Sequence, residues 1–325
     1  MDVERYRQIL HLCFPQLTMS SIKFLGGGTF RVFEVNGDRT SQQALIFRFP
    51  HGGAGGGLLQ RERQVCNGLG PSLPIAIPRY DYFSESCPLF DRPVAGYPRL
   101  PGVALQDCTL DGAAQGKAAE QLGGFLSTLH SLPVEGFWAN LLPSPTPIQL
   151  RDRQRALYAE VQRYAFPSLS AQKRAWIETL FEPFLAEEAN WQFETALVHG
   201  DLDSSNILYD PMQHSIVGIL DFEETSLGDP AWDFCVLLAE YGSDFLQDML
   251  AAYRLPLDAH FGERVAFHAR RILFHELLYG IQVGAPEYAD HAQERLRRAM
   301  AGLEPIGGWL AASTSETRSQ EGYLA

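Results

Sequence analysis

Short apolar runs separated by turn residues mark the first third of the chain. Five of these runs predict strands, over residues 22–25, 30–35, 44–49, 78–83 and 90–97. Apolar residues at helical spacing predict a leading helix over Val3–Cys13 and a second helix over Leu58–Leu69. Asn36-Gly37-Asp38 has the composition of a hairpin turn. The pattern therefore predicts a five-stranded antiparallel sheet accompanied by one main helix.

From Asp111 onward the apolar spacing becomes helical. Helices are predicted over residues 113–132, 150–166, 172–189, 231–241, 244–253, 262–283 and 286–303. The segment between the two patterns, Tyr97–Gly102, contains the Pro and Gly residues typical of a domain boundary. We therefore expect an N-terminal lobe at 1–97, a hinge at 98–104, a helical C-terminal lobe at 105–312 and a disordered polar tail at 313–325.

The stretch from Leu197 to Leu238 carries polar residues in a fixed order after predicted strands. His199-Gly200-Asp201 follows one apolar run, Asn206 comes five residues after the aspartate, and Asp221 ends the β-branched run that starts at Ser215. Any one of these residues alone would be read as a turn former. Together they match the protein-kinase order, in which one Asp faces the substrate hydroxyl while an Asn and a second Asp hold Mg²⁺. The sequence thus predicts a phosphoryl-transfer site.

Because it carries these residues in this order, the chain resembles the aminoglycoside phosphotransferase family. The 2″-O-phosphotransferases are the most similar, since they carry much the same His-Gly-Asp-Leu-x-x-x-Asn-Ile-Leu-Tyr, Asp-Phe and Gly-Asp-Pro run. A late helix also resembles theirs at 277–281, and the resemblance covers roughly residues 20–300. It implies an α+β, bilobed protein-kinase-like fold, with a small antiparallel β N-lobe with one main helix and a larger, mostly helical C-lobe.

The resemblance gives each residue of the motif an expected role. Asp201 is the expected catalytic base, and Asn206 and Asp221 are the expected catalytic residues that ligate Mg²⁺. His199 is expected to brace the loop rather than to do chemistry. Asp233 resembles the buried carboxylate that anchors the catalytic loop in this family.

A glycine-rich turn lies between the first two predicted strands. Gly27, Gly28 and Thr29 would let backbone N–H groups approach the phosphates of a nucleotide without obstruction by side chains. A plain turn is the alternative reading. The second glycine-rich tract, residues 51–57, is predicted to be a flexible linker rather than another phosphate loop.

Arg48 stands on the third strand where kinase-like folds place a lysine. Arginine supplies positive charge to the phosphates but is not interchangeable with lysine there. We assign Arg48 a phosphate role with Glu62 as its partner on the following helix; a solvated surface arginine is the alternative. Tyr97 and Leu100 bound the hinge segment whose backbone groups are expected to bind the adenine or guanine edge.

The predicted substrate residues are carboxylates and their neighbours near the catalytic motif or on the late helices. They are Asp203, Ser204, Glu223, Glu224, Glu240, Glu276 and Tyr279. Glu276 and Tyr279 lie three residues apart and so share a helix face. Carboxylates with an aromatic ring suit an ammonium-rich aminoglycoside through charge-assisted hydrogen bonds and stacking. The alternative is that each is a solvated surface charge.

Composition narrows the classes of partner. The 325-residue chain has a formal net charge of −13, which argues against nucleic acid and suits a cationic ligand. No apolar run is long enough to span a bilayer, and the N-terminal segment lacks the features of an export signal, so we expect a cytoplasmic monomer. The five cysteines include no CxxC pair and are predicted to be reduced thiols, mostly in the core.

These observations predict a Mg²⁺-dependent phosphotransferase that moves the γ-phosphate of ATP or GTP to an aminoglycoside hydroxyl. The resemblance points to the 2″-hydroxyl and to antibiotic resistance. One alternative is a kinase of another small molecule on the same fold, such as a macrolide, choline, homoserine or a ketosamine. An alternative of another class is a nucleotide-binding pseudokinase, which Arg48 in place of lysine keeps open.

Overall fold

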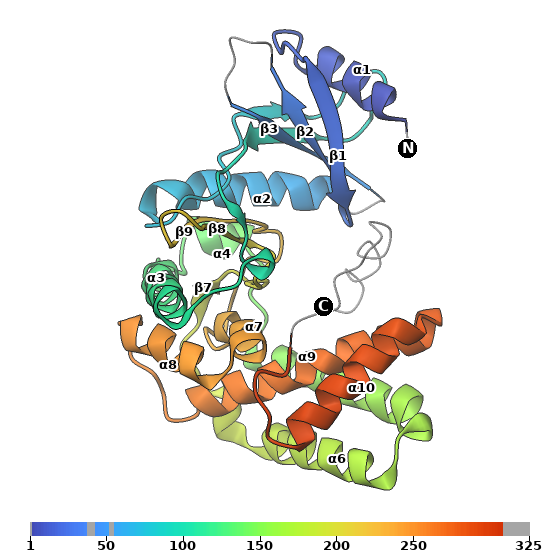
Figure 1. The fold of residues 1–325 in the computed structure, drawn as a ribbon, viewed down its shortest axis with the longest axis vertical. Coiled ribbons are helices and arrows are strands. Elements are labelled where there is room, and N and C mark those ends of the chain that lie inside the picture. Colours follow the sequence, from blue (N-terminus) through green and yellow to red (C-terminus); the bar gives the residue numbers. More distant parts are fainter. Residues whose placement is uncertain (1, 38–42, 52–54, 308–325) are drawn as a thin grey trace.

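The computed structural model describes residues 2–37, 43–51 and 55–307, and these form two stacked lobes (Figure 1). The N-terminal lobe is a five-stranded antiparallel sheet in the order β1-β2-β3-β5-β4. Its strands are β1 Ser21–Gly27, β2 Phe30–Asn36, β3 Leu45–Pro50, β4 Tyr82–Ser84 and β5 Val94–Pro98. Helix α1 (Val3–Cys13) packs on one face and α2 (Gly55–Leu69) lies toward the second lobe. The predicted sheet and the kinase-like fold class are confirmed.

The two-residue period of β3 sends its side chains to opposite faces of the sheet. Phe47 and Phe49 face α1, where Phe33 and Tyr6 complete an aromatic cluster with ring centroids 4.5 Å apart for Tyr6 and Phe33. Arg48, between the two phenylalanines, therefore faces α2 and the second lobe. The strand period alone thus carries this arginine toward the interlobe region.

Two predicted strands are shorter than expected. The run over 78–83 becomes a strand only at Tyr82, because the backbone N–H and C=O of Tyr80 are bonded to the side-chain amide of Asn67, at 2.8 and 3.1 Å. The run over 90–97 starts its strand at Val94, after Pro93, which has no N–H to donate to a ladder.

The prediction that residues 51–57 form a flexible linker is wrong for its last part. Gly55, Gly56 and Gly57 begin α2, and a Cβ on Gly55 would lie 2.9 Å from Pro50 Cβ, so the helix start is packed closely on β3. Three predicted segments lie wholly or partly outside the described residues. They are the rest of this tract at 52–54, Asp38 at the end of the predicted hairpin turn, and the predicted tail at 313–325.

The C-terminal lobe is mostly helical, as predicted. Its helices are α3 Gly112–His130, α4 Phe137–Leu141, α5 Pro147–Glu160, α6 Ala171–Ala186, α7 Trp232–Tyr241, α8 Ser243–Ala252, α9 Phe261–Val283 and α10 Pro286–Met300. A π-helical turn, Val161–Ala165, extends α5, and a 3-10 turn, Glu188–Trp191, follows α6. Short strands form two small sheets: β6 Val103–Ala104 with β8 Ile207–Asp210 and β9 Ser215–Ile219, and β7 Ala196–Val198 with β10 Ser226–Gly228.

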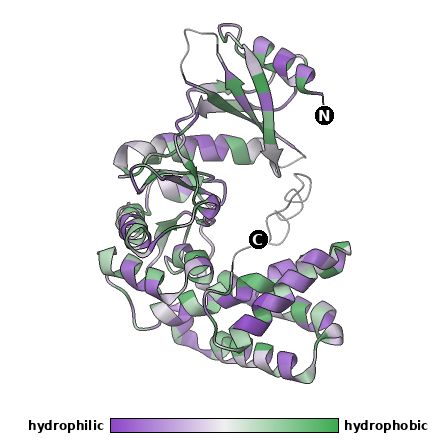
Figure 2. Ribbon diagram, viewed as in Figure 1, coloured by the Kyte–Doolittle hydropathy of each residue, from purple (hydrophilic) through white to green (hydrophobic). Residues whose placement is uncertain are grey.

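The lobe contains two apolar cores. Figure 2 shows hydrophobic and hydrophilic stretches alternating along the helices that contribute to them. One unites α2, α3, α7 and the small sheets, and it reaches both lobes. The other joins α5 and α6 to α9 and α10, where Phe184 and Phe267 stack with ring centroids 3.6 Å apart. The amide of Ile219 also donates to Ala76 O at 2.9 Å, so the segment after α2 is bonded directly to β9. The second core therefore packs α5, α6 and α10 along α9, and the bond to Ala76 links the two lobes.

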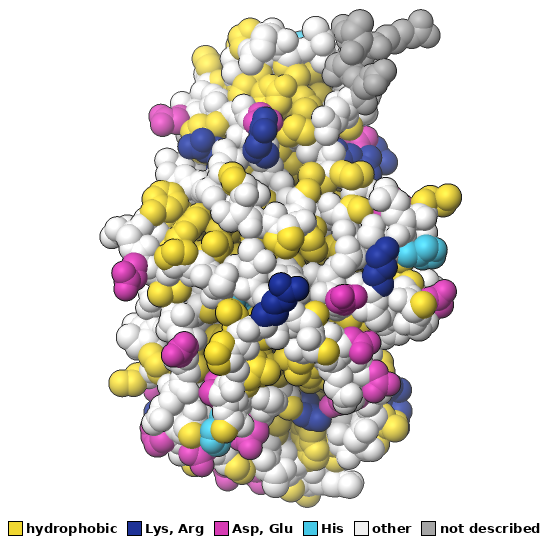
Figure 3. Space-filling model, turned by 90° about the vertical axis from the view of Figure 1, so that its left-hand side faces the viewer, with side chains coloured by type: hydrophobic (Ala, Val, Ile, Leu, Met, Phe, Trp, Pro, Cys, Tyr) yellow, Lys and Arg dark blue, Asp and Glu magenta, His cyan; other side chains and the backbone are white. Residues whose placement is uncertain are grey.

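On the face shown in Figure 3, Lys and Arg side chains are scattered among apolar ones, and acidic side chains gather toward the lower edge of the view. Across the residues that the structure describes, no helix combines the length and apolar character needed to cross a bilayer. The five cysteines are free thiols, but only Cys66 and Cys235 are buried, so the expectation that most lie in the core is wrong.

Candidate active site

A buried carboxylate on α7 holds the loop that follows β7. Asp233 accepts hydrogen bonds from His199 N at 2.7 Å, from Gly200 N at 2.9 Å and from His130 Nε2 at 3.0 Å. Burial works to raise the pKa of Asp233, but His130 and these donors hold it below its ordinary value. Gly200 has φ +90°, and a Cβ there would lie 2.4 Å from Glu224 O, so only glycine fits this turn. The loop is thereby fixed at its first residues.

His199 links this loop to the segment after β9. Its Nε2 donates to Leu220 O at 3.0 Å, and its Nδ1 accepts from Asp201 N at 3.2 Å. Leu220 N donates in turn to Asn206 O at 2.8 Å. The next residue, Asp221, adopts a left-handed backbone with φ +62°, which Asp tolerates better than most residues. Because both imidazole nitrogens are engaged, His199 holds the two segments together and has no lone pair left for proton transfer.

Asn206 and Asp201 lie side by side at the end of the loop. The Nδ2 of Asn206 donates to Asp201 O at 2.9 Å and to Asp201 Oδ2 at 3.2 Å, which orients the amide. Its Oδ1 is left for another partner, and the carboxylate of Asp221 is one third exposed. Oxygen ligands of this kind suit Mg²⁺, which completes its shell with phosphate and water oxygens. No cluster of three His, Cys, Asp or Glu residues suited to a metal occurs in the described part of the chain.

Arg48 lies where the sequence predicts, between α2 and the second lobe. It forms a buried ion pair with Glu62, donates to Asp221 Oδ1 at 3.2 Å and lies 4.2 Å above the ring of Phe30. Burial disfavours the charge on Arg48, but Glu62 and Asp221 outweigh it and raise its pKa well above the ordinary value. Tyr80 Oη, a neighbour that the sequence did not indicate, lies 3.5 Å from the guanidinium. The alternative of a solvated surface arginine is wrong.

The glycine-rich turn joins β1 and β2. Gly27 allows its tight course, because a Cβ there would lie 2.4 Å from Phe30 O. Gly28 and Thr29 complete the turn, and the Thr29 side chain hydrogen-bonds the carboxylate of Glu223. The turn is therefore held near the segment that carries Asp221.

The segment after β5 joins the lobes. Tyr97, at the end of β5, is buried, and Leu100 lies close to β9, where a Cβ on Gly218 would be 3.1 Å from Leu100 Cδ1. The N–H of Arg99 donates to Ala44 O at 2.8 Å, which leaves fewer backbone groups for a ligand than the sequence suggested.

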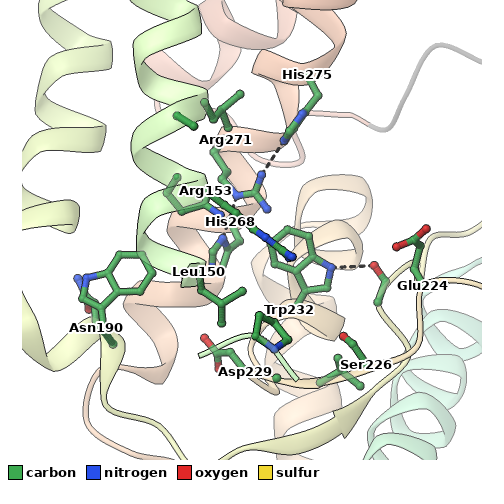
Figure 4. Close-up of a pocket in the computed structure, with 18 of the residues that line it drawn as sticks. Leu150, Arg153, Asn190, Glu224, Ser226, Asp229, Trp232, His268, Arg271 and His275 are labelled. Carbon is green, nitrogen blue, oxygen red and sulfur yellow. Dashed lines mark hydrogen bonds between the residues drawn. The ribbon is translucent and has the colours of Figure 1, made fainter. Parts of the chain in front are cut away.

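A cavity of about 500 Å³ opens beside the catalytic loop (Figure 4). Its wall is formed by α5, the Glu188–Trp191 turn, the β7–β10 sheet, α7 and α9. Gly200 lines it, so its edge lies next to Asp201. Of the predicted substrate residues, only Glu224 and Tyr279 line this cavity.

Glu276 does not line the cavity, so the structure does not support its predicted contact with the substrate. The side chain has no exposed surface; it forms an ion pair with Arg295 at 2.9 Å and a hydrogen bond with His291 at 2.7 Å, between α9 and α10. Helix α9 is buried on nearly all sides, so helical spacing alone could not show which face meets the cavity. Tyr279, one turn later, lies on the cavity side.

Asp203, Ser204 and Glu240 organise the loop and do not line the cavity. Asp203 Oδ1 accepts from the backbone N–H groups of Ser205 and Asn206, at 2.8 and 3.1 Å. Glu240 accepts from Ser204 N at 3.1 Å. Short Asp and Ser side chains often bond to nearby backbone in this way, which is a competing use that the sequence did not resolve.

Glu223 points toward the nucleotide side, 3.6 Å from Arg48, rather than into the cavity. Burial raises the pKa of Glu223 to about 7, with the Asp221 carboxylate adding to the effect. The next residue, Glu224, does line the cavity, as do Glu160 and Asp229.

Several cavity residues were missed in the sequence. Most of them are basic or aromatic: Arg153, Trp191, Phe193, Trp232, His268, Arg271 and His275. Two are acidic, Glu160 and Asp229. The sequence does carry a signal for part of this set, since Arg271, His275 and Tyr279 recur every four residues and so share one stripe of the helix.

Comparison with known proteins agrees with this geometry. The model of the phosphotransferase enzyme family matches residues 21–268. Viomycin phosphotransferase of Streptomyces vinaceus is 29% identical over 156 residues, which are 47% of this chain and 52% of that protein, so the match spans about half of that relative's length.

Solved structures share the fold over nearly the whole chain. The GDP and kanamycin complex of APH(2″)-IIia has a TM-score of 0.79 and 24% identity, covering 91% of this chain and 98% of that one. Macrolide 2′-phosphotransferase MphH of Brachybacterium faecium has a TM-score of 0.67 and 20% identity, covering 85% and 92%. Since the family model spans most of the sequence and these neighbours reproduce the two lobes, the chain belongs to the phosphotransferase enzyme family.

Proposed function

We propose that this protein transfers the γ-phosphate of ATP or GTP to a hydroxyl of a small molecule in the presence of Mg²⁺. The observation that carries the proposal is the pairing of Arg48 with Asp221 across the lobes, beside a loop that presents Asp201 at the edge of a cavity. Phosphate-binding and acceptor-binding regions then meet at one point. We assign residues 1–97 to nucleotide binding, 98–104 to the hinge and 105–312 to catalysis and acceptor binding.

In this proposal Asp201 accepts the proton of the acceptor hydroxyl and aligns its oxygen with the γ-phosphorus. Phosphoryl transfer depends mainly on such positioning and on neutralising phosphate charge. Arg48 and the backbone of the Gly27–Thr29 turn bind the phosphates. Mg²⁺, when held by Asn206 and Asp221, supplies further neutralisation of phosphate charge. Asp233 and His199 keep Asp201 in place through the backbone bonds already described.

Two acceptor classes are the first to test. An aminoglycoside, modified at its 2″-hydroxyl with resistance as the outcome, is supported by the fold shared with kanamycin- and gentamicin-bound phosphotransferases and by Glu224 at the cavity edge. A macrolide is supported by the fold shared with macrolide phosphotransferases and by the aromatic cavity wall. We further propose a monomer acting in the cytoplasm, where the nucleotide is available.

The test is a screen of purified protein with Mg²⁺ and either ATP or GTP, read as release of nucleoside diphosphate that depends on an added acceptor. Aminoglycosides, macrolides and small hydroxylated compounds serve as acceptors, and mass spectrometry identifies the phosphorylated product. One phosphorylated acceptor supports the proposal. Nucleotide binding without transfer to any acceptor would instead favour a regulatory pseudokinase.

A further inference from the structure

One cavity side chain is a buried cation that has no acidic partner in the part of the chain that the structure describes. Arg271, on α9, is 2% exposed. Its Nε donates to His268 Nδ1 at 3.0 Å, its terminal nitrogen bonds His275 Nε2 at 2.7 Å, and its guanidinium lies 4.3 Å above the ring of Trp232. No Asp or Glu among the described residues forms an ion pair with it. Figure 4 shows the guanidinium between His275 and Trp232 on the cavity wall.

Neither neighbouring histidine neutralises this charge. Burial lowers the pKa of His268 well below its ordinary value and that of His275 to about 3, so both are neutral acceptors at neutral pH. Burial also lowers the pKa of Arg271, but only to about 10, so the guanidinium remains charged. The carboxylates that line the cavity are Glu160, Glu224 and Asp229. None of the three forms an ion pair with Arg271, and Asp229 is paired with Arg264 at 2.7 Å. Buried charges in proteins are usually paired, so Arg271 has no counter-ion among the described residues.

Arg271 lies close to the catalytic loop, from which it is separated by the side chain of Trp232. The indole of Trp232 donates through Nε1 to Gly200 O at 2.7 Å, beside Asp201, and its ring lies under Arg271. The guanidinium and the catalytic loop therefore stand on either side of one indole. Trp191 and Phe193 add aromatic surface to the same cavity, whose volume of about 500 Å³ is that of a small-molecule site.

We propose that Arg271 binds an anionic oxygen group of the acceptor, a carboxylate or a phosphate ester, while the acceptor's hydroxyl lies at Asp201. The planar guanidinium matches such groups with paired hydrogen bonds. The proposal rests on the proposed function and narrows it. A wholly cationic acceptor would leave Arg271 without a counter-ion and bring more positive charge beside it.

The kinetic test compares acceptors in matched pairs, each a hydroxylated aromatic or alicyclic acid and its primary amide, together with sugar phosphates and their parent sugars. Wild type is expected to prefer the charged member about ten- to hundredfold in kcat/KM, which is the range for a charged hydrogen bond. Arg271→Gln removes the preference, and Arg271→Lys keeps part of it. Arg270→Gln is the matched control, because Arg270 points away and pairs with Glu304 at 2.6 Å.

A binding test without nucleotide keeps the inference separate from turnover. Trp191 and Trp232 line the cavity, so their fluorescence reports its occupation. We expect 4-hydroxyphenylacetate to change the fluorescence saturably in wild type and Arg270→Gln, and about ten- to hundredfold more weakly in Arg271→Gln, with 4-hydroxyphenylacetamide weak throughout. Circular dichroism tests whether each variant is folded. If Arg271→Gln does not fold, the comparison is made with Arg271→Lys instead.

The outcomes separate the two proposals. Acid binding that requires Arg271, without transfer to any acceptor, supports the anion subsite and overturns the proposed function. Transfer to an aminoglycoside at equal rates in wild type and Arg271→Gln supports the proposed function and overturns the subsite. Equal use of acid and amide, or no binding of any anionic compound, overturns the subsite as well.

Discussion

At the scale of single residues, Arg48 contributes both to the stability of the N-terminal lobe and to the contact between the lobes. It neutralises Glu62, which is fully buried, and it reaches Asp221 in the other lobe. Arg48→Met should destabilise the protein by about 3–5 kcal/mol, because it leaves an uncompensated buried carboxylate. It should also weaken nucleotide binding. Denaturant unfolding and calorimetry measure the two effects.

Arg48→Lys is the control for that substitution. Lysine restores the charge without the fork, so most of the stability should return while the contact with Asp221 is weakened. Unchanged stability in Arg48→Met would contradict the assigned pairing.

Residue identity could be predicted where chemistry and spacing act together. The Arg48–Glu62 ion pair was predicted correctly, because kinase-like folds pair a basic residue of the third strand with a Glu of the following helix. Asp203 and Ser204 were misplaced because a short polar side chain in a loop can bond to the backbone or to a ligand, and sequence does not show which. Arg271 was missed because its significance lies in having no acidic partner among the described residues, which only the folded structure reveals.

At the scale of elements, α9 and α10 are held together by the buried group Glu276, Arg295 and His291. Glu276→Gln should lower the free energy of unfolding by about 3 kcal/mol, because Arg295 would keep a buried charge without its counter-ion. The KM for the acceptor should not change. Urea unfolding and steady-state kinetics test this. A higher KM at unchanged stability would restore Glu276 to the substrate site.

Helix α7 carries a pH-dependent contribution through Glu240. Burial raises the pKa of Glu240 from 4.5 to about 7, the Asp203 carboxylate adds to this, and the bond from Ser204 opposes it. The folded protein therefore holds a proton that the unfolded chain has released. Its contribution is fully present below pH 4.5 and is lost as pH rises through about 7, on the order of 2–3 kcal/mol.

Glu240→Gln should remove that part of the pH dependence. Urea unfolding of both proteins from pH 5 to pH 8 should show a smaller loss of stability in the variant as pH rises. Parallel curves would show that Glu240 titrates alike in the folded and unfolded states.

The presence of a helix or strand could be predicted better than the direction in which each of its faces points. The sheet, α2 and the helices of the second lobe follow from apolar period, and their bounds are close to those expected. Tyr80 shows why some ends failed, since a side-chain amide from α2 replaces the strand ladder there. Which face of α9 borders the cavity depends on packing from α5 and α10, which no local period encodes.

At the scale of the whole molecule, the two lobes meet where Arg48 reaches Asp221 and where Ile219 bonds the segment after α2. The family fold could be predicted because its motif residues hold one another through backbone bonds that need a fixed spacing. The acceptor could not, since the cavity is lined by side chains from α5, α7 and α9, which are far apart in the sequence and come together only in the fold.

The most direct test of the central claim compares wild type with Asp201→Asn, using Mg²⁺ and the acceptor found in the screen. The variant should bind ATP or GTP as wild type does, while acceptor-dependent transfer falls about 10²- to 10⁴-fold, the usual contribution of a positioned general base. Transfer by Asp201→Asn at the wild-type rate would contradict the assignment of Asp201 and, with it, the proposed site of phosphoryl transfer.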